Sequence, residues 1–378
     1  MKPPPSMPPR LPAAVALVAV LHLASGGCAA PEPAPSAFGG GDWTDKLIDA
    51  AGQVTLAAES GALFYAVDAL ALPGKEVGLT AKVTSVKNMK GIKDVTVAFL
   101  RGKDALGQVK TDEDGNAVLS WKPPAAGDYD ITAKVAAVAD EQWQELVKLP
   151  AAPLRVAVRP RETRFVVIDL DHTVVASSFF RVLIGGAKPM PDAAKVIKEL
   201  QKKYSIVYLT HRPDLLTAKS KGWLAESGFP RAPLLVSTLK QAVGDSGEFK
   251  TARLKSLRET FPGVALGIGD KFSDAQAYVD NGLDAYLIPH YDRDTDDPKD
   301  LREVAEKVRK LDKKIHVVDN WQEVRAGIFQ GRKFPPGPYA DRLEARARKL
   351  LAERDRRKSA KRRRKGDDDD DDDDEDDD

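Results

Sequence analysis

Two carboxylates and a hydroxyl follow directly after a buried-strand pattern in the middle of the chain. Residues 165–168 are uniformly apolar, and Asp169, Asp171 and Thr173 come next at alternate positions. Charged side chains are costly inside such a strand, so they are expected at its carboxyl end, where open parallel sheets bind ligands. There one carboxylate can act as a nucleophile while the other moves protons.

More chemistry-bearing side chains follow the next apolar runs. They are Thr210 and His211 at the end of residues 205–210, Lys250 at the start of a helical pattern, and Asp270 and Asp274 after residues 264–269. The chain thus predicts three strands that each end in polar residues. A hydroxyl, an ammonium and several carboxylates would meet at their ends.

In this order and spacing, these residues resemble the haloacid-dehalogenase-like (HAD) phosphohydrolase superfamily. Its four motifs are matched by Asp169 with Asp171, by Thr210, by Lys250, and by Asp270 with Asp274. Neither gap between the motifs has room for an inserted cap domain, which indicates the capless branch. Residues 208–213, 222–224, 248–250 and 267–274 are similar to lipin-type and actin-patch-type phosphatidate phosphatases and to the related Nir proteins. His172 stands where that family usually has Gly or Asp, and Asp270 where lipins have Asn.

The resemblance implies a Mg²⁺-dependent phosphatase that works through an aspartyl-phosphate. Asp169 would attack phosphorus, Asp171 would protonate the leaving oxygen, and Thr210 and Lys250 would stabilise the phosphoryl group. The implied metal ligands are Asp169, Asp171, Asp270 and Asp274, because a hard cation prefers oxygen donors. The implied substrate contacts are Thr173 and His211.

Each residue also has an ordinary structural interpretation. Asp171 and Asp274 are suitable helix caps, Lys250 is suitable as a surface lysine, and His211 as a packing or loop residue. An uncapped site is open and favours a bulky substrate, such as phosphatidate or another lipid phosphate. Two alternatives remain at this point: a lipid-binding module without catalysis, and a polynucleotide phosphatase.

The elements around these motifs predict two folded parts. Residues 161–325 alternate strands and helices, which predicts an α/β, HAD-like Rossmannoid parallel sheet without a cap. Residues 72–160 alternate apolar and polar positions between turns, which predicts a small immunoglobulin-like β-sandwich. Residues 43–71 are expected to be helical. The composition, with 378 residues and 42% hydrophobic side chains, is sufficient for two domains.

The N-terminal residues resemble an export signal. Residues 1–28 combine basic residues, a short apolar core and small residues, and Cys28 follows a sequence similar to a lipoprotein cleavage box. Cys28 is therefore a candidate lipid anchor, and residues 29–42 a Pro/Gly tether. These features predict an exported protein of the bacterial cell envelope.

The C-terminal residues 326–378 carry opposite charges in two blocks. Residues 343–365 are strongly basic, and residues 367–378 are eleven aspartates and one glutamate. Without those twelve acids, 45 acidic residues face 58 basic ones, a net charge of +13 against +1 for the whole chain. Such blocks predict a disordered tail. It would either bind an anionic membrane or nucleic acid, or act only as a solubilising segment.

Overall fold

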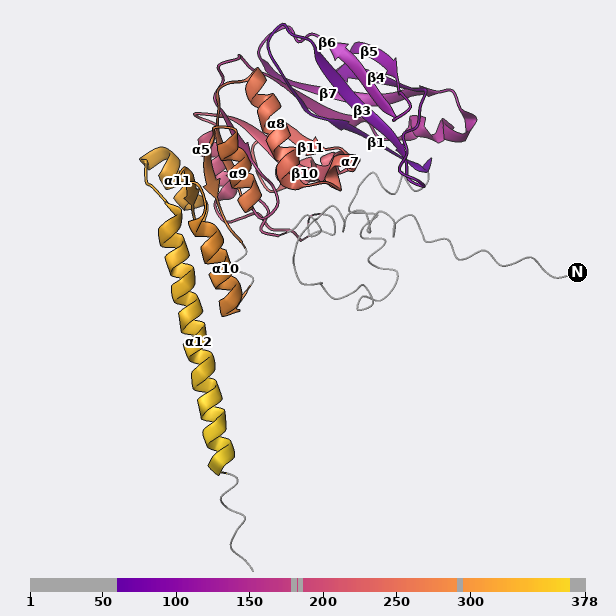
Figure 1. The fold of residues 1–378 in the computed structure, drawn as a ribbon. Coiled ribbons are helices and arrows are strands. Elements are labelled where there is room, and N and C mark those ends of the chain that lie inside the picture. Colours follow the sequence, from indigo (N-terminus) through magenta and orange to yellow (C-terminus); the bar gives the residue numbers. More distant parts are fainter. Residues whose placement is uncertain (1–59, 178–181, 183–185, 291–294, 368–378) are drawn as a thin grey trace, which may run out of the picture.

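A computed structural model describes residues 60–177, 182, 186–290 and 295–367. Figure 1 shows a β-rich part beside an α/β part, from which one long helix projects. The predicted signal, tether and Cys28 anchor lie outside the described residues. Most of the predicted helical segment and the acidic run from 368 onward also lie outside them.

A six-stranded sheet forms the α/β part, and every neighbouring pair in it is parallel. Its strands in spatial order are β11 (Leu234–Ser237), β10 (Ser205–Pro213), β9 (Phe165–Ile168), β12 (Val264–Gly269), β13 (Asp284–Leu287) and β14 (Ile315–Val317). The predicted parallel α/β sheet is therefore confirmed.

Helices cover both faces of this sheet, which explains why its central strand is continuously apolar. Along β9, Phe165 and Val167 join the core on one face, while Val166 and Ile168 join the core on the other. The first face carries α8 (Ser246–Thr260), α9 (Phe272–Asp280), α10 (Pro298–Arg309) and α12 (Pro336–Asp367). The second carries α5 (Ala193–Leu200), α6 (Thr217–Glu226) and α11 (Trp321–Gln330).

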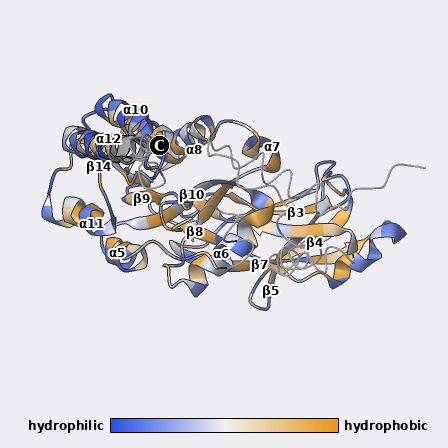
Figure 2. Ribbon diagram, turned by 90° about the horizontal axis from the view of Figure 1, so that it is seen from below, coloured by the Kyte–Doolittle hydropathy of each residue, from blue (hydrophilic) through white to orange (hydrophobic). Residues whose placement is uncertain are grey.

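Two short helices complete the α/β part. They are the 3₁₀ helix η3 (Asp214–Leu216), after β10, and α7 (Leu239–Ala242), after β11. Figure 2 shows the hydropathy of this arrangement, with apolar strands inside and hydrophilic surfaces on α10 and α12.

The β-rich part consists of two sheets that share one apolar core. One sheet contains β1 (Ala62–Val67), β3 (Val77–Ser85) and β6 (Asn116–Trp121). The other contains β2 (Ala69–Ala71), β8 (Ala152–Val158), β7 (Gly127–Val138), β4 (Val95–Arg101) and β5 (Asp104–Lys110), and the 3₁₀ helix η2 (Glu141–Lys148) precedes β8. The predicted β-structure of residues 72–160 is present, and the immunoglobulin-like arrangement stays a prediction.

Strands replace part of the segment that was expected to be helical. Within residues 43–71, β1 pairs antiparallel with β3 from Ala62 opposite Ser85 to Val67 opposite Thr80. Residues 62–66 are all buried, so this run is apolar on both sides rather than on one helical face. The helical expectation for residues 62–71 was wrong because a short apolar run does not separate a buried strand from a helix.

A helix replaces much of the tail that was expected to be disordered. The first half of α12 buries Tyr339, Ala340, Leu343 and Ala347 against the core that it shares with α10. These positions recur at helical spacing and form one stripe. The expectation failed here because the high charge of the segment concealed the stripe.

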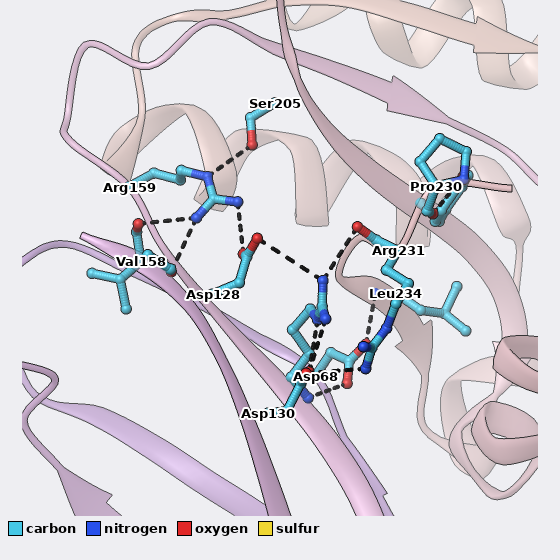
Figure 3. Close-up of polar contacts among 12 residues, drawn as sticks. Asp68, Asp128, Asp130, Val158, Arg159, Ser205, Pro230, Arg231 and Leu234 are labelled. Carbon is cyan, nitrogen blue, oxygen red and sulfur yellow. Dashed lines mark hydrogen bonds and ion pairs between the residues drawn. The ribbon is translucent and has the colours of Figure 1, made fainter. Parts of the chain in front are cut away.

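A buried carboxylate joins the two parts of the molecule at the short break between β1 and β2 (Figure 3). Asp68 accepts hydrogen bonds from the backbone N–H of Arg155 at 2.7 Å and of Leu234 at 3.0 Å. Its Oδ1 also lies 2.7 Å from Nζ of Lys221 on α6, and the Asp68 side chain is fully buried. Arg155 belongs to β8 and Leu234 to β11, so one side chain connects a strand of each part to the other.

Candidate functional site

Three adjacent strands end in residues that the sequence analysis singled out. Ile168 of β9 is level with Ile268 of β12 in the parallel register. Asp169 follows the first strand and Asp270 the second, while Thr210 lies near the end of β10 on the other side of β9. All three side chains are buried at the carboxyl edge of the sheet.

Three carboxylates form a compact group at this edge. Asp169, Asp270 and Asp274 each offer an oxygen, and these oxygens lie within 4.8 Å of one another. Asp274 reaches the group from the first turn of α9, and its close approach requires glycine at the end of β12. A Cβ on Gly269 would lie 2.9 Å from Oδ2 of Asp274.

A buried lysine lies against two of these carboxylates. Nζ of Lys250 is 2.7 Å from Oδ1 of Asp169 and 2.7 Å from Oδ1 of Asp274. Lys250 lies in the first turns of α8, which begins where the Asp245 side chain accepts a hydrogen bond from the Glu248 N–H. The alternative that Lys250 is a surface lysine was wrong, because its side chain is only 2% exposed.

The charges of the cluster do not balance. Three buried carboxylates surround one buried ammonium, so negative charge is in excess. Burial, strengthened by the neighbouring carboxylates and opposed by Lys250, raises the pKa of Asp169 to about 8. Burial and the neighbouring Asp274 raise the pKa of Asp270 to about 8 as well. Burial alone would lower the pKa of Lys250, but Asp169 and Asp274 raise it well above its ordinary value.

The donor set fits a hard divalent cation. Oδ1 of Asp270 and Oδ2 of Asp274 are buried without a hydrogen-bond partner among the described residues. Carboxylate oxygens are the ligands that Mg²⁺ prefers. A charge of +2 would neutralise the four side chains together, which removes the cost of burying uncompensated charge.

Asp171 is held outside this group by an arginine. Arg212 donates from Nε to Oδ2 at 3.0 Å and from Nη2 to Oδ1 at 2.6 Å. Arg212 is itself buried and donates from Nη1 to Ser220 Oγ at 2.9 Å. The structure therefore pairs Asp171 with a fixed guanidinium and does not place it among the three clustered carboxylates.

The two predicted substrate contacts lie in different surroundings. Thr173 is fully buried, and its Oγ1 has no hydrogen-bond partner within the described part of the chain. The His211 ring contacts the Gln241 backbone oxygen through Nε2 at 2.9 Å, and burial lowers its pKa. The His211 ring thus has a polar contact with α7, and its role as a substrate contact stays a prediction.

Three residues near the site were not assigned a role from the sequence. Arg212 holds Asp171, and Trp321 donates from Nε1 to the Thr173 backbone oxygen at 2.8 Å. His290 lies with its Nδ1 2.8 Å from Oδ2 of Asp270. Arg212 was detectable because it immediately follows Thr210 and His211. Trp321 and His290 lie far from the motifs in sequence and gave no signal.

Comparison with known proteins identifies a similar domain in the same region. Residues 166–288 match the family model of the LNS2 domain of PITM 1-3. Membrane-associated phosphatidylinositol transfer protein 2 of Mus musculus is 35% identical over 105 residues, which are 27% of this chain and 7% of that protein. The chain therefore spans only a small part of that relative.

Similar solved structures have low overall agreement. The Pnkp1/Rnl/Hen1 RNA repair complex shares 15% identity over 34% of this chain and 42% of that chain, with a TM-score of 0.28. The D0-D1 domain of Intimin shares 19% identity over 25% of this chain and 43% of that chain, with a TM-score of 0.17.

These matches correct two predictions. The family predicted from the motifs, the capless HAD-like phosphohydrolases, was wrong, because the matching family is the LNS2 domain of PITM 1-3. The predicted export to a bacterial envelope was wrong as well, because the matching protein is a membrane-associated protein of the mouse. That prediction depended on residues 1–28, which lie outside the described residues. Among the described helices, none has the length and apolar character to cross a bilayer. Over residues 166–288, the chain is similar to the LNS2 domain of PITM 1-3.

Proposed function

We propose that the protein is a Mg²⁺-dependent phosphatase that hydrolyses a phosphomonoester carried by a lipid. The observation that carries this proposal is the buried cluster of Asp169, Asp270 and Asp274 with Lys250 at the carboxyl edge of a parallel sheet. Phosphoryl transfer depends mainly on positioning and on stabilising negative charge. A buried ammonium and a cation held by three carboxylates would supply that stabilisation.

Each side chain has a distinct part in this proposal. Asp169 is the nucleophile, held in place by Lys250, and Asp270 and Asp274 hold the cation with it. Thr210 donates to phosphoryl oxygens, and so does Thr173, whose hydroxyl has no hydrogen-bond partner among the described residues. Asp171 is the proton carrier and must give up part of its contact with Arg212 to take up a proton, since both of its oxygens accept from that guanidinium.

The lipid part of the proposal is supported by the comparisons. The mouse relative is named for phosphatidylinositol transfer and for its association with membranes. A phosphorylated lipid such as phosphatidate presents its phosphate at a membrane surface. Such a substrate is too large to be enclosed in a pocket.

The test measures phosphate release from phosphatidate vesicles, with and without Mg²⁺, by the unmodified protein and by Asp169→Asn. We expect release from the unmodified protein only with Mg²⁺, and none from Asp169→Asn. Asp284→Asn is the matched control, because Asp284 is an exposed residue at the start of β13. Equal release by both aspartate variants would contradict the proposal. Release from phosphorylated oligonucleotides alone would overturn the lipid substrate.

One observation favours a second function, lipid binding without catalysis. The bidentate pairing of Asp171 with Arg212 holds the proposed proton carrier away from the cluster. A binding module predicts that vesicles are bound without any release of phosphate. It also predicts that Asp169→Asn binds them as well as the unmodified protein does.

A further inference from the structure

Two stacked imidazoles lie beside the carboxylate cluster and have no part in the chemistry described above. The rings of His172 and His290 are 4.0 Å apart between centroids, with planes inclined by 12°. His172 follows Asp171, and His290 lies in the segment after β13. The stack therefore connects two loops at the carboxyl edge of the sheet.

His290 contacts one oxygen of a cluster carboxylate. Its Nδ1 is 2.8 Å from Oδ2 of Asp270, whose side chain is fully buried, although the ring N–H is not fully aligned with that oxygen. When Asp270 is ionised, as it must be to hold a cation, a lone pair on Nδ1 would face one on Oδ2, so in that state Nδ1 carries the hydrogen. Oδ1 of Asp270 remains buried without a hydrogen-bond partner among the described residues.

His290 lies next to the three candidate metal ligands and is not one of them. Within the described residues, the ligand atoms that lie within 4.8 Å of one another belong to Asp169, Asp270 and Asp274 only. A side chain that contacts a metal-ligating carboxylate without touching the metal fixes the orientation of that carboxylate. Such contacts strengthen metal binding.

The backbone at His172 adopts an uncommon conformation. His172 has φ of 54°, in the left-handed region, where residues other than glycine are uncommon although His is among those enriched there. Its ring lies parallel to that of His290 at contact distance. A glycine at this position would therefore keep the backbone conformation and remove the ring.

We propose that His290 is a positioning residue that keeps Oδ1 of Asp270 available to the cation, and that His172 holds the His290 ring in this orientation. The inference deepens the proposed function in one respect: it requires a cation at Asp169, Asp270 and Asp274. It requires neither hydrolysis nor a lipid.

The test is titration calorimetry of Mg²⁺ binding to the full chain, with two substitutions that separate the roles of His290. His290→Phe keeps a flat ring for the stack and removes the Nδ1 donor, and we expect Mg²⁺ affinity to fall by about 10- to 100-fold. His290→Asn keeps an amide donor near the position of Nδ1, and we expect a smaller loss.

His172 is tested by His172→Gly, since glycine adopts the left-handed backbone without strain. We expect an intermediate loss of affinity. The double variant with His290→Phe should bind Mg²⁺ no more weakly than His290→Phe alone, because both substitutions act through the same contact.

The control is His316→Phe. His316 also stacks on an aromatic ring, that of Tyr286, with centroids 4.7 Å apart, on β14. Unchanged affinity in His290→Phe, or an equal loss in His316→Phe, would overturn the inference. So would the absence of Mg²⁺ binding by the unmodified protein. If Mg²⁺ binds and depends on His290 but no phosphate is released, the phosphatase proposal fails and this inference stands.

Discussion

At the scale of single residues, the site is defined by an excess of buried negative charge. Asp169, Asp270 and Asp274 lie around one ammonium, that of Lys250, while Asp171 is paired with the guanidinium of Arg212. The cluster therefore keeps a net negative charge unless it binds protons or a cation. Protons and Mg²⁺ must compete for it.

The first prediction concerns this competition. Because the pKa values of Asp169 and Asp270 are raised to about 8, Mg²⁺ must displace protons below that pH. We expect Mg²⁺ affinity to rise by about tenfold per pH unit for each displaced proton between pH 6 and pH 8. Calorimetry in two buffers of different ionisation enthalpy measures the protons released. A pH-independent affinity without proton release would contradict the prediction.

The same raised pKa values determine whether the folded protein gains or loses stability as the pH rises. Without metal, the folded protein binds more protons than the unfolded chain from about pH 4, the ordinary carboxyl value, up to about pH 8. The stabilisation by these protons is present below that window, and it is lost as the pH rises through it. We expect the melting temperature in EDTA to fall across this range, and Mg²⁺ to reverse the fall at pH 8.

At the scale of elements, most of the strands beside the site could be predicted from sequence. The apolar run before Asp169 coincides with β9, and the run before Asp270 coincides with β12. Buried parallel strands are easily recognised because both faces are apolar. The short, mostly exposed β5 was missed, since its residues Asp104–Lys110 have little apolar pattern.

Some site residues could be placed from their neighbours in sequence, and others depend on contacts with residues distant in sequence. Asp169 and Asp270 directly follow strands and Thr210 lies near the end of one, so the adjacency of these strands brings the three residues together. The separation of Asp171 from the cluster depends on the direction of one guanidinium, that of Arg212, which no spacing reveals. The contact of His290 depends on a segment that follows a different strand.

The second prediction concerns α12. Leu343 is 4% exposed in the stripe that packs against α10, so Leu343→Ala should lower the free energy of unfolding by about 2–5 kcal/mol. Leu351→Ala is the matched control, because Leu351 is only half-buried on the same helix. Urea denaturation measures both. Equal losses would contradict the role of the stripe.

At the scale of the whole molecule, the junction depends on Asp68. This carboxylate has contacts in both parts, and its partner Lys221 is 25% exposed. The third prediction is that Asp68→Ala lowers the free energy of unfolding by about 3–5 kcal/mol, since it leaves a partly buried ammonium and two backbone N–H groups without their acceptor.

The control for this prediction is Asp104→Ala, which removes an exposed ion pair with Arg101. Exposed pairs contribute about 0–1 kcal/mol, so this variant should unfold close to the unmodified protein. Chemical denaturation of both variants measures the difference. If Asp68→Ala unfolds no earlier than Asp104→Ala, the two parts are held together by other contacts.

The burial of α12 also bears on where the folded unit around the site begins and ends. The segment that matches the known family, residues 166–288, contains the clustered carboxylates but lacks β14 and also α10 and α12, two of the four helices on one face of its sheet. It also lacks Asp68, which accepts from the Leu234 N–H inside it. A fragment limited to residues 166–288 would therefore contain the clustered carboxylates but would lose part of one covering layer and the acceptor of the Leu234 N–H. The stretch that keeps all of these contacts extends from β1 through the first half of α12.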